Sequence, residues 1–146
     1  MIISEKKNFE RKFFRNLRNK KSANDMRKVE INVKTYVDSI FRQDLKKKYI
    51  GIYWPLENEV DLRSLGHEYL LALPRCEENK NLLFCAWDKK QLSKDLHGIL
   101  APYSSNKLSY EKISMIFIPC LSVDRNLIRL GYGGGYFDKL REDQNW

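Results

Sequence analysis

The residues with the clearest chemical potential lie near the C-terminus, in the run Arg129-Leu130-Gly131-Tyr132-Gly133-Gly134-Gly135-Tyr136-Phe137-Asp138. Four of the seven glycines in the chain fall within five positions of this run. Glycine permits positive φ angles, and successive N–H groups without side chains form an anion-binding nest. A helix beginning at Tyr136 would point its free N–H groups at the same anion. Arg129 adds positive charge, and the carboxylate of Asp138 suits Mg²⁺ carried on phosphates. The run therefore predicts a phosphate-binding loop.

Two common phosphate-loop patterns do not fit this run. No Lys-Ser or Lys-Thr pair follows the glycines, as a Walker A loop requires, and their spacing differs from a Rossmann dinucleotide fingerprint. A surface turn without a ligand is the alternative interpretation, and a lone glycine-rich loop favours it. The order of the residues around the glycines carries the more specific information.

That order closely resembles the C-terminal signature of the 5-formyltetrahydrofolate cyclo-ligase family. The signature reads R-L-G-(Y/R)-G-x-G-Y-(Y/F)-D and follows an apolar strand, a proline and an aspartate. Here the strand and proline are Ile116-Phe117-Ile118-Pro119, and the aspartate is Asp124. The resemblance implies that ATP is bound by Arg129, Leu130, Gly131, Tyr132, Gly133, Gly134, Gly135 and Tyr136. It also implies catalytic roles for Arg129 and Tyr136, and a Mg²⁺-binding role for Asp138.

Two helices are predicted at the N-terminus, over residues 4–20 and 23–47, from the spacing of apolar side chains. The first helix places Phe9, Phe13, Phe14 and Leu17 on one stripe. The second helix places Val29, Val33, Tyr36, Val37, Ile40, Phe41 and Leu45 on a stripe that we expect to be buried. Three lysines at residues 46–48 close this helix, which suits a helix C-terminus.

The first helix also carries candidate phosphate ligands. Lys7 and Arg11 are four residues apart, so both project from one face, and spacing alone favours a solvated basic face. Cyclo-ligases open with K-x-x-x-R, followed after ten intervening residues by Ser or Thr, and Lys7, Arg11 and Ser22 match this spacing. The resemblance therefore implies that Lys7 and Arg11 reach the ATP phosphates. Arg15 is a rival, because Arg11-x-x-x-Arg15 also fits loosely.

A buried parallel strand is predicted over residues 49–54, and Pro55 ends it. The polar loop that follows lies at the carboxyl edge of a sheet, where open α/β folds bind ligands. Asp61 is a plausible N-cap for a helix over residues 62–68. The resemblance implies that Glu59 contacts the reduced pterin and that Trp54 lines the folate site. The alternatives are a first-turn helix charge for Glu59 and a core aromatic for Trp54.

Further strands are predicted over residues 69–75, 82–87 and 113–119, with a polar and partly helical excursion over 88–97. Phe84 and Trp87 are assigned to core packing rather than to a pterin wall. His67 and His97 lack a catalytic constellation in the sequence and are assigned to structure. The order of elements predicts an α/β fold, with a three-layer α-β-α arrangement, a mainly parallel sheet and two N-terminal helices.

The 146 residues suit a single domain over residues 1–146, and 42% hydrophobic content excludes a disordered chain. A net charge of +8 attracts anions such as nucleic acid, a membrane face or polyanionic small molecules. More than half of the 27 Lys and Arg residues precede residue 49, where they also solvate the helices. The three cysteines match no metal or redox motif and are expected to be reduced.

No signal peptide or membrane-spanning run is recognisable, so we expect a cytoplasmic protein without a membrane partner. Only eight residues follow Asp138, whereas family members continue through another strand and a second acidic residue. We therefore expect a cyclo-ligase-like domain that is short at its C-terminus.

The resemblance implies an enzyme of one-carbon metabolism that uses ATP and Mg²⁺ to convert 5-formyltetrahydrofolate to 5,10-methenyltetrahydrofolate, releasing ADP and phosphate. The substrate can carry a polyglutamate tail, which a basic surface suits. We expect a monomer without a nucleic-acid partner. The alternatives are a catalytically incomplete relative that binds nucleotide or folate, and a basic nucleic-acid-binding module, although no recognition motif for the latter is visible.

Overall fold

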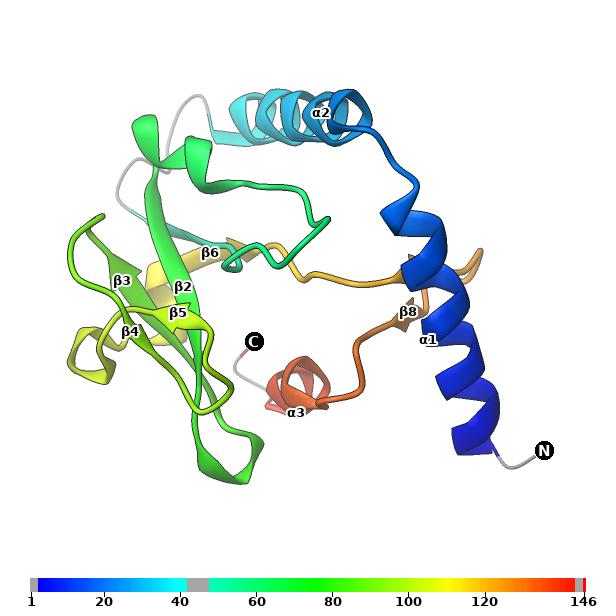
Figure 1. Ribbon diagram of the computed structural model, residues 1–146. Coiled ribbons are helices and arrows are strands. Elements are labelled where there is room, and N and C mark those ends of the chain that lie inside the picture. Colours follow the sequence, from blue (N-terminus) through cyan, green and yellow to red (C-terminus); the bar gives the residue numbers. More distant parts are fainter. Residues whose placement is uncertain (1–2, 42–47, 144–145) are drawn as a thin grey trace.

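A computed structural model describes residues 3–41, 48–143 and 146 (Figure 1). Its helices are α1 (Ile3–Asn19), α2 (Ala23–Phe41) and α3 (Tyr136–Glu142). Its strands are β1 (Tyr49–Gly51), β2 (Leu70–Cys76), β3 (Leu82–Trp87), β4 (Ser93–Lys94), β5 (Leu100–Ala101), β6 (Ile113–Ile116), β7 (Ser122–Val123) and β8 (Arg129–Leu130). Four 3₁₀ turns connect them, η1 (Arg63–His67), η2 (Glu78–Lys80), η3 (Ser104–Asn106) and η4 (Tyr110–Lys112).

The central sheet has the strand order β3-β2-β1-β6. Strand β1 pairs in parallel with both β2 and β6, so that Ile50 lies opposite Leu71 on one side and Met115 on the other. Strand β3 runs antiparallel to β2. Ile50 is fully buried, as expected for a strand between two parallel neighbours. The predicted mainly parallel sheet is confirmed.

Helices cover both faces of this sheet, which confirms the predicted three-layer α/β fold. On one face, α2 and η1 pack over the strands. The buried residues of that core are Val37, Phe41, Ile50, Ile52, Leu62, Leu65, Leu71 and Leu73. On the other face, α3 packs over a smaller core of Ala72, Leu82, Phe84 and Leu108. Phe84 is 1% exposed, so its assignment to the core is confirmed.

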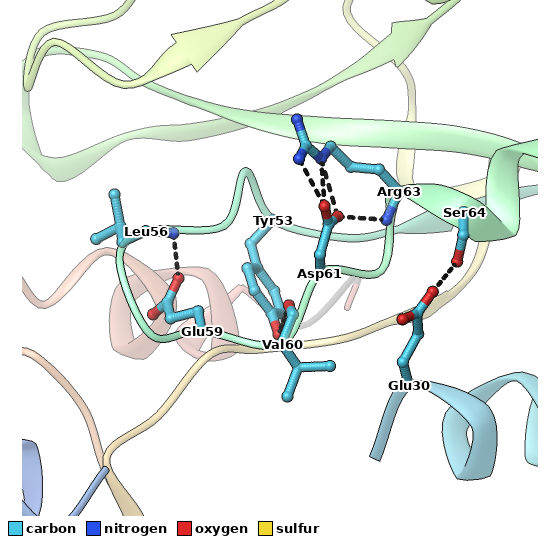
Figure 2. Close-up of polar contacts among 8 residues, drawn as sticks. All are labelled: Glu30, Tyr53, Leu56, Glu59, Val60, Asp61, Arg63 and Ser64. Atoms are coloured by element: carbon cyan, nitrogen blue, oxygen red, sulfur yellow. Dashed lines mark hydrogen bonds and ion pairs between the residues drawn. The ribbon is translucent and has the colours of Figure 1, made fainter. Parts of the chain in front are cut away.

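Helix α2 buries a narrower stripe than the sequence predicted. Val37 and Phe41 are buried, but Val29, Tyr36 and Ile40 are 45–56% exposed. The reason is that α2 meets the core mainly through its C-terminal half, while polar contacts such as Ser64 Oγ to Glu30 Oε1 (2.6 Å, Figure 2) join its first half to η1. Leu45 and residues 46 and 47 of the predicted helix lie outside the described residues.

Helix α1 stands beside β8, away from the sheet (Figure 1). Its predicted apolar stripe does not form a core, because Phe9 and Phe13 are 69% and 50% exposed and Leu17 is also exposed. Only Phe14, at the edge of the stripe, is half-buried. The face that α1 turns towards the protein is its cationic one, and this orientation brings Arg11 and Arg18 into contact with the C-terminal loop, while Arg15 stays exposed.

Two short predictions are wrong in detail. The helix predicted over residues 62–68 is the 3₁₀ turn η1, and its N-cap is Leu62 rather than the predicted Asp61. Asp61, one residue earlier, accepts the Arg63 backbone N–H at 3.0 Å (Figure 2). The stretch over residues 88–97 contains strand β4 rather than a helix. There the Asp95 carboxylate takes up local N–H groups that a helix would otherwise use. Across the described part of the chain, each helix is too short or too polar to cross a membrane.

Candidate active site

The glycine loop (residues 131–135) connects β8 to α3. The antiparallel pair β7–β8 fixes its start, with Ser122 opposite Leu130, and α3 begins at Tyr136 as predicted. Gly133 and Gly135 have φ angles of +103° and +77°, in the region that favours glycine. Two of the loop glycines therefore adopt backbone angles that other residues disfavour, and the lack of side chains also leaves the loop N–H groups accessible to a ligand.

Helix α1 reaches this loop through Arg11. The Nε of Arg11 donates to the Gly131 carbonyl oxygen at 3.1 Å, and its Nη1 donates to Asn8 Oδ1 at 2.9 Å. A Cβ atom on Gly133 would lie 3.3 Å from the Arg11 guanidinium carbon, so glycine permits this close approach. Of the rival arginines, Arg11 meets the loop, whereas Arg15 is exposed.

A polar cleft of about 520 Å³ lies between α1, β8 and the glycine loop. Its basic lining consists of Lys7, Arg11 and Arg129, and the loop contributes Gly131, Gly133 and Gly135. Leu130 also lines it, as do three acidic residues, Glu10, Asp124 and Asp138. Residues predicted to hold phosphate therefore come from both ends of the chain. Three basic side chains beside exposed glycine backbone can hold a polyphosphate.

An apolar cavity of about 250 Å³ lies on the other side of the glycine loop. Trp54, Glu59, Tyr132 and Tyr136 line it, together with Tyr53, Leu56, Pro74, Ile99 and the loop glycines. Apolar walls with a few convergent polar groups are typical of a site for a flat organic ligand. The two residues expected at the folate, Trp54 and Glu59, thus line the same cavity as Tyr132 of the loop and Tyr136 of α3.

The polar cleft and the apolar cavity share one wall. Arg129, Gly131, Gly133, Gly135 and Asp138 line both of them. A phosphate held in the cleft and an acceptor oxygen held in the cavity would meet across this wall. Such an arrangement suits group transfer from a nucleotide to a second ligand, because it fixes the two reactants in mutual proximity.

Glu59 is held at the end of the loop after β1. Its Oε2 accepts the Leu56 N–H at 2.8 Å (Figure 2), and its Oε1 accepts the Tyr132 hydroxyl. The Nη1 of Arg18 donates to the same hydroxyl and lies 3.7 Å from Glu59 Oε1. Arg18 and Glu59 are 17% and 4% exposed. Burial, with the hydrogen bond to Glu59, raises the pKa of Tyr132 to about 12, so this phenol stays protonated at neutral pH.

The sequence profile of the 5-formyltetrahydrofolate cyclo-ligase family matches residues 3–145. The chain belongs to this family. The enzyme class expected from the glycine-rich signature is therefore confirmed. No curated protein matches the chain significantly.

Two solved structures are similar to this cyclo-ligase family member. The NMR structure of 5,10-methenyltetrahydrofolate synthetase from Aquifex aeolicus has a TM-score of 0.75 and 27% identity. That match covers 93% of this chain and 72% of the Aquifex chain. The synthetase from Mycoplasma pneumoniae has a TM-score of 0.67 and 20% identity, with 94% of this chain and 77% of that one covered. Both matches support the α/β fold.

Asp138 of this cyclo-ligase does not belong to a preformed carboxylate cage. Its Oδ1 accepts Arg129 Nη2 at 2.6 Å, and its side chain is 70% exposed. Among residues 3–41, 48–143 and 146, no three His, Cys, Asp or Glu side chains group as a metal site. Mg²⁺ commonly takes one or two protein carboxylates together with substrate phosphates. The donor set therefore fits a metal that arrives on a nucleotide.

Trp54 serves both as a wall and as a packing partner. It lines the apolar cavity, and its ring lies 6.1 Å edge-on from Trp87. The guanidinium of Arg63 covers the ring at 4.5 Å, while its donors bind Asp61 (Figure 2). Trp54 thus lines the cavity and also packs against the core, and its contact with folate stays a prediction. Trp87 is half-buried behind it and is not among the cavity-lining residues.

Sequence reasoning missed three residues of this site, Arg18, Lys80 and His97. The ammonium of Lys80, from the turn η2, would lie 3.5 Å from a Cβ on Gly135, so it approaches the loop from the sheet side. His97, assigned to structure, lines the apolar cavity, and its Nε2 lies 2.6 Å from the Tyr136 hydroxyl. Arg18 is helically spaced with Lys7 and Arg11, which is a signal that could have placed it on the same face.

Proposed function

We propose that this protein catalyses the ATP- and Mg²⁺-dependent cyclisation of 5-formyltetrahydrofolate to 5,10-methenyltetrahydrofolate. The observation that carries the proposal is the glycine loop as a common wall between the polar cleft and the apolar cavity. Family membership supplies the reaction class. We also propose that residues 1–146 act as one domain, because α1 and the C-terminal loop build the same cleft.

The cleft side is the proposed nucleotide site. Lys7, Arg11 and Arg129 would offset the phosphate charge, and the glycine loop would present its N–H groups to the phosphate oxygens. Asp138 would hold Mg²⁺ directly or through water, in exchange for its contact with Arg129. The metal would neutralise phosphate charge as transfer proceeds. In phosphoryl transfer the protein itself forms few covalent bonds. Its main tasks are to position the reactants and to stabilise the developing charge.

The cavity side is the proposed folate site. Glu59, fixed by Leu56 and Tyr132, would orient the pterin through its carboxylate, and Trp54 would line the ring. Tyr136 and Tyr132 border the loop and would meet the formyl group. The net charge of +8 suits a substrate with a polyglutamate tail.

An amide oxygen is a poor leaving group, so the formyl oxygen must be activated before the ring can close. Transfer of the γ-phosphoryl group of ATP to the formyl oxygen releases ADP and gives an imidate-like phosphate ester. N10 then attacks the formyl carbon and loses its proton. Phosphate departs with the former formyl oxygen, which leaves the methenyl bridge between N5 and N10. Arg129, at the shared wall, and Tyr136, which lines the cavity beside it, are the proposed catalytic residues because they lie where charge would develop.

The direct test is absorbance growth of the methenyl product with purified protein, 5-formyltetrahydrofolate, Mg²⁺ and ATP. We expect growth that requires ATP and stops when Mg²⁺ is chelated. Binding of ATP and of 5-formyltetrahydrofolate is measured in parallel by calorimetry. No growth despite binding of both would overturn catalysis and favour an incomplete relative. Failure of both binding and growth would leave only the fold in common with the family.

A further inference from the structure

We infer that His97 is a positioning residue that orients the Tyr136 phenol towards the bound formyl group. This inference rests on the proposed function and adds a residue to its site. The observations that carry it are a direct contact between the two side chains and a rigid anchor for each of them.

The contact itself is close and well oriented. His97 Nε2 and the Tyr136 hydroxyl oxygen are 2.6 Å apart. The two rings meet edge to face, with centroids 5.1 Å apart and planes at 88°. Both residues line the apolar cavity. The pair therefore restrains the phenol at the point where the cavity meets the glycine loop.

The backbone around His97 is fixed by Asp95. Its Oδ1 accepts the N–H groups of His97 (2.9 Å) and Ile99 (3.0 Å), and its Oδ2 accepts the Cys76 N–H of β2 (3.0 Å). The Asp95 carbonyl oxygen also accepts the Gly98 N–H at 3.0 Å, and Gly98 has a φ of +76°. One carboxylate thus ties the turn over residues 95–99 to the central sheet.

Tyr136 is anchored from the opposite direction. It is the first residue of α3, and it packs with Phe137 and Leu140 against the core of Phe84 and Leu82. Between two anchored backbones, the hydrogen bond restricts the orientation of the phenol. Positioning of this kind matters because small displacements of a reacting group lower rates strongly.

The hydrogen-bond direction follows from the substrate's chemistry. A formyl or phosphorylated formyl oxygen has lone pairs and no proton, so it needs a donor. When His97 donates through Nε2–H, the Tyr136 oxygen accepts and its own O–H is free to donate to the substrate. The titratable neighbours of the pair are Asp95 and Cys76, and burial raises the pKa of the Cys76 thiol to about 12, so it stays neutral.

Replacement of His97 offers a clean test because the side chain is exposed and contributes little to the core. His97→Leu removes the hydrogen bond, and His97→Gln retains an amide donor near the Nε2 position. His67→Gln changes the other histidine, which lies exposed on η1, and is the matched control. We expect His97→Leu to lower kcat about 10-fold, in line with the loss of one hydrogen bond, with an unchanged KM for ATP. His97→Gln should recover most of this loss.

A double-mutant cycle with Tyr136→Phe tests whether His97 acts through Tyr136. In the Tyr136→Phe background we expect His97→Leu to have no further effect on kcat. A second full loss there would overturn the inference, as would unchanged kcat in His97→Leu.

A readout independent of activity is the imidazole ¹⁵N spectrum, because the chain has only two histidines. Tyr136→Phe should shift the Nε2 resonance of His97 and leave that of His67 unchanged. An active protein without this shift would overturn the His97 inference alone. An inactive wild-type protein that shows the shift would overturn the proposed function and the catalytic role of the pair, while the contact itself stood.

Discussion

The Nε of Arg11 donates to the carbonyl oxygen of Gly131 across 3.1 Å, although the two residues are 120 positions apart in the chain. This bond fixes the N-terminal helix against the glycine loop. It also distinguishes Arg11 from Arg15, which has similar spacing but is exposed outside the polar cleft.

Arg11→Ala should weaken ATP binding by about 10- to 100-fold, because a hydrogen bond to a charged group contributes roughly 1.5–3 kcal/mol. Arg15→Ala is the matched control from the same helix and should bind ATP as the wild type does. Calorimetric titration with ATP checks both variants. Equal losses in the two variants would contradict the assignment of Arg11 to the cleft.

Gly133→Ala should lower both stability and ATP affinity. An L-residue at a φ of +103° costs roughly 1–2 kcal/mol, and the new Cβ would lie 3.3 Å from the Arg11 guanidinium carbon. Thermal unfolding should shift down by roughly 3–6 °C.

Gly134→Ala gives the comparison within the same loop. Gly134 is not among the positive-φ glycines, and its Cβ would meet only the Tyr136 ring, at 3.2 Å. It should therefore unfold at a higher temperature than Gly133→Ala. The reverse order would show that backbone strain is not the main role of Gly133.

Arg18 and Glu59 should be energetically coupled. Their side chains are 17% and 4% exposed and share the Tyr132 hydroxyl, so loss of either one leaves the other buried with fewer partners. We expect Arg18→Ala and Glu59→Gln to show a coupling energy of about 1–3 kcal/mol in urea unfolding. Lys20→Ala, exposed just after α1, is the control. Additive effects of the two changes would argue against a shared network.

Tyr132 should make stability fall at alkaline pH. Burial raises its pKa to about 12 in the folded protein, whereas the pKa of an unfolded tyrosine is about 10. Above pH 10 the unfolded state releases a proton that the folded state keeps, so the stabilising contribution is full below pH 10 and is lost towards pH 12. The measurement is the unfolding free energy of the wild type minus that of Tyr132→Phe between pH 8 and 12. A difference that stays constant over this range would contradict the raised pKa.

Asp138→Asn should raise the Mg²⁺ concentration needed for half-maximal turnover about 10-fold or more, because Mg²⁺ prefers carboxylate oxygen. The free energy of unfolding should change by less than about 1 kcal/mol, because the Asp138 side chain in the ion pair with Arg129 is 70% exposed. Glu142→Gln, exposed on the same helix, is the control. Unchanged Mg²⁺ dependence would remove Asp138 from the metal site.

The sequence predicted the sheet and the glycine loop well because their signals are local. The apolar run of residues 82–87 became β3 with the same bounds, and α3 begins at Tyr136, directly after the glycines. Strand-forming runs bounded by polar turns, and clustered glycines, depend little on distant parts of the chain.

Contacts set by tertiary placement were not predictable in the same way. The periodicity of α1 located its apolar stripe but not the direction it faces, since polar groups of the glycine loop attract the opposite, cationic face. Arg18 meets Tyr132 across 114 positions, and His97 meets Tyr136 across 39. Nothing in the local sequence around either residue identifies such a partner.

The cationic face of α1 has one more consequence. The helix is joined to the rest of the protein by polar contacts, from Arg11 to Gly131, from Arg18 to Tyr132 and from Asn58 to Asn19. Its docking therefore depends in part on Arg11 and on the same loop that would hold an anion. Thermodynamic reciprocity then requires that a bound anion change helix docking by the same factor by which docking changes anion affinity. Protease resistance of the first twenty residues would thus report ligand occupancy from outside the site.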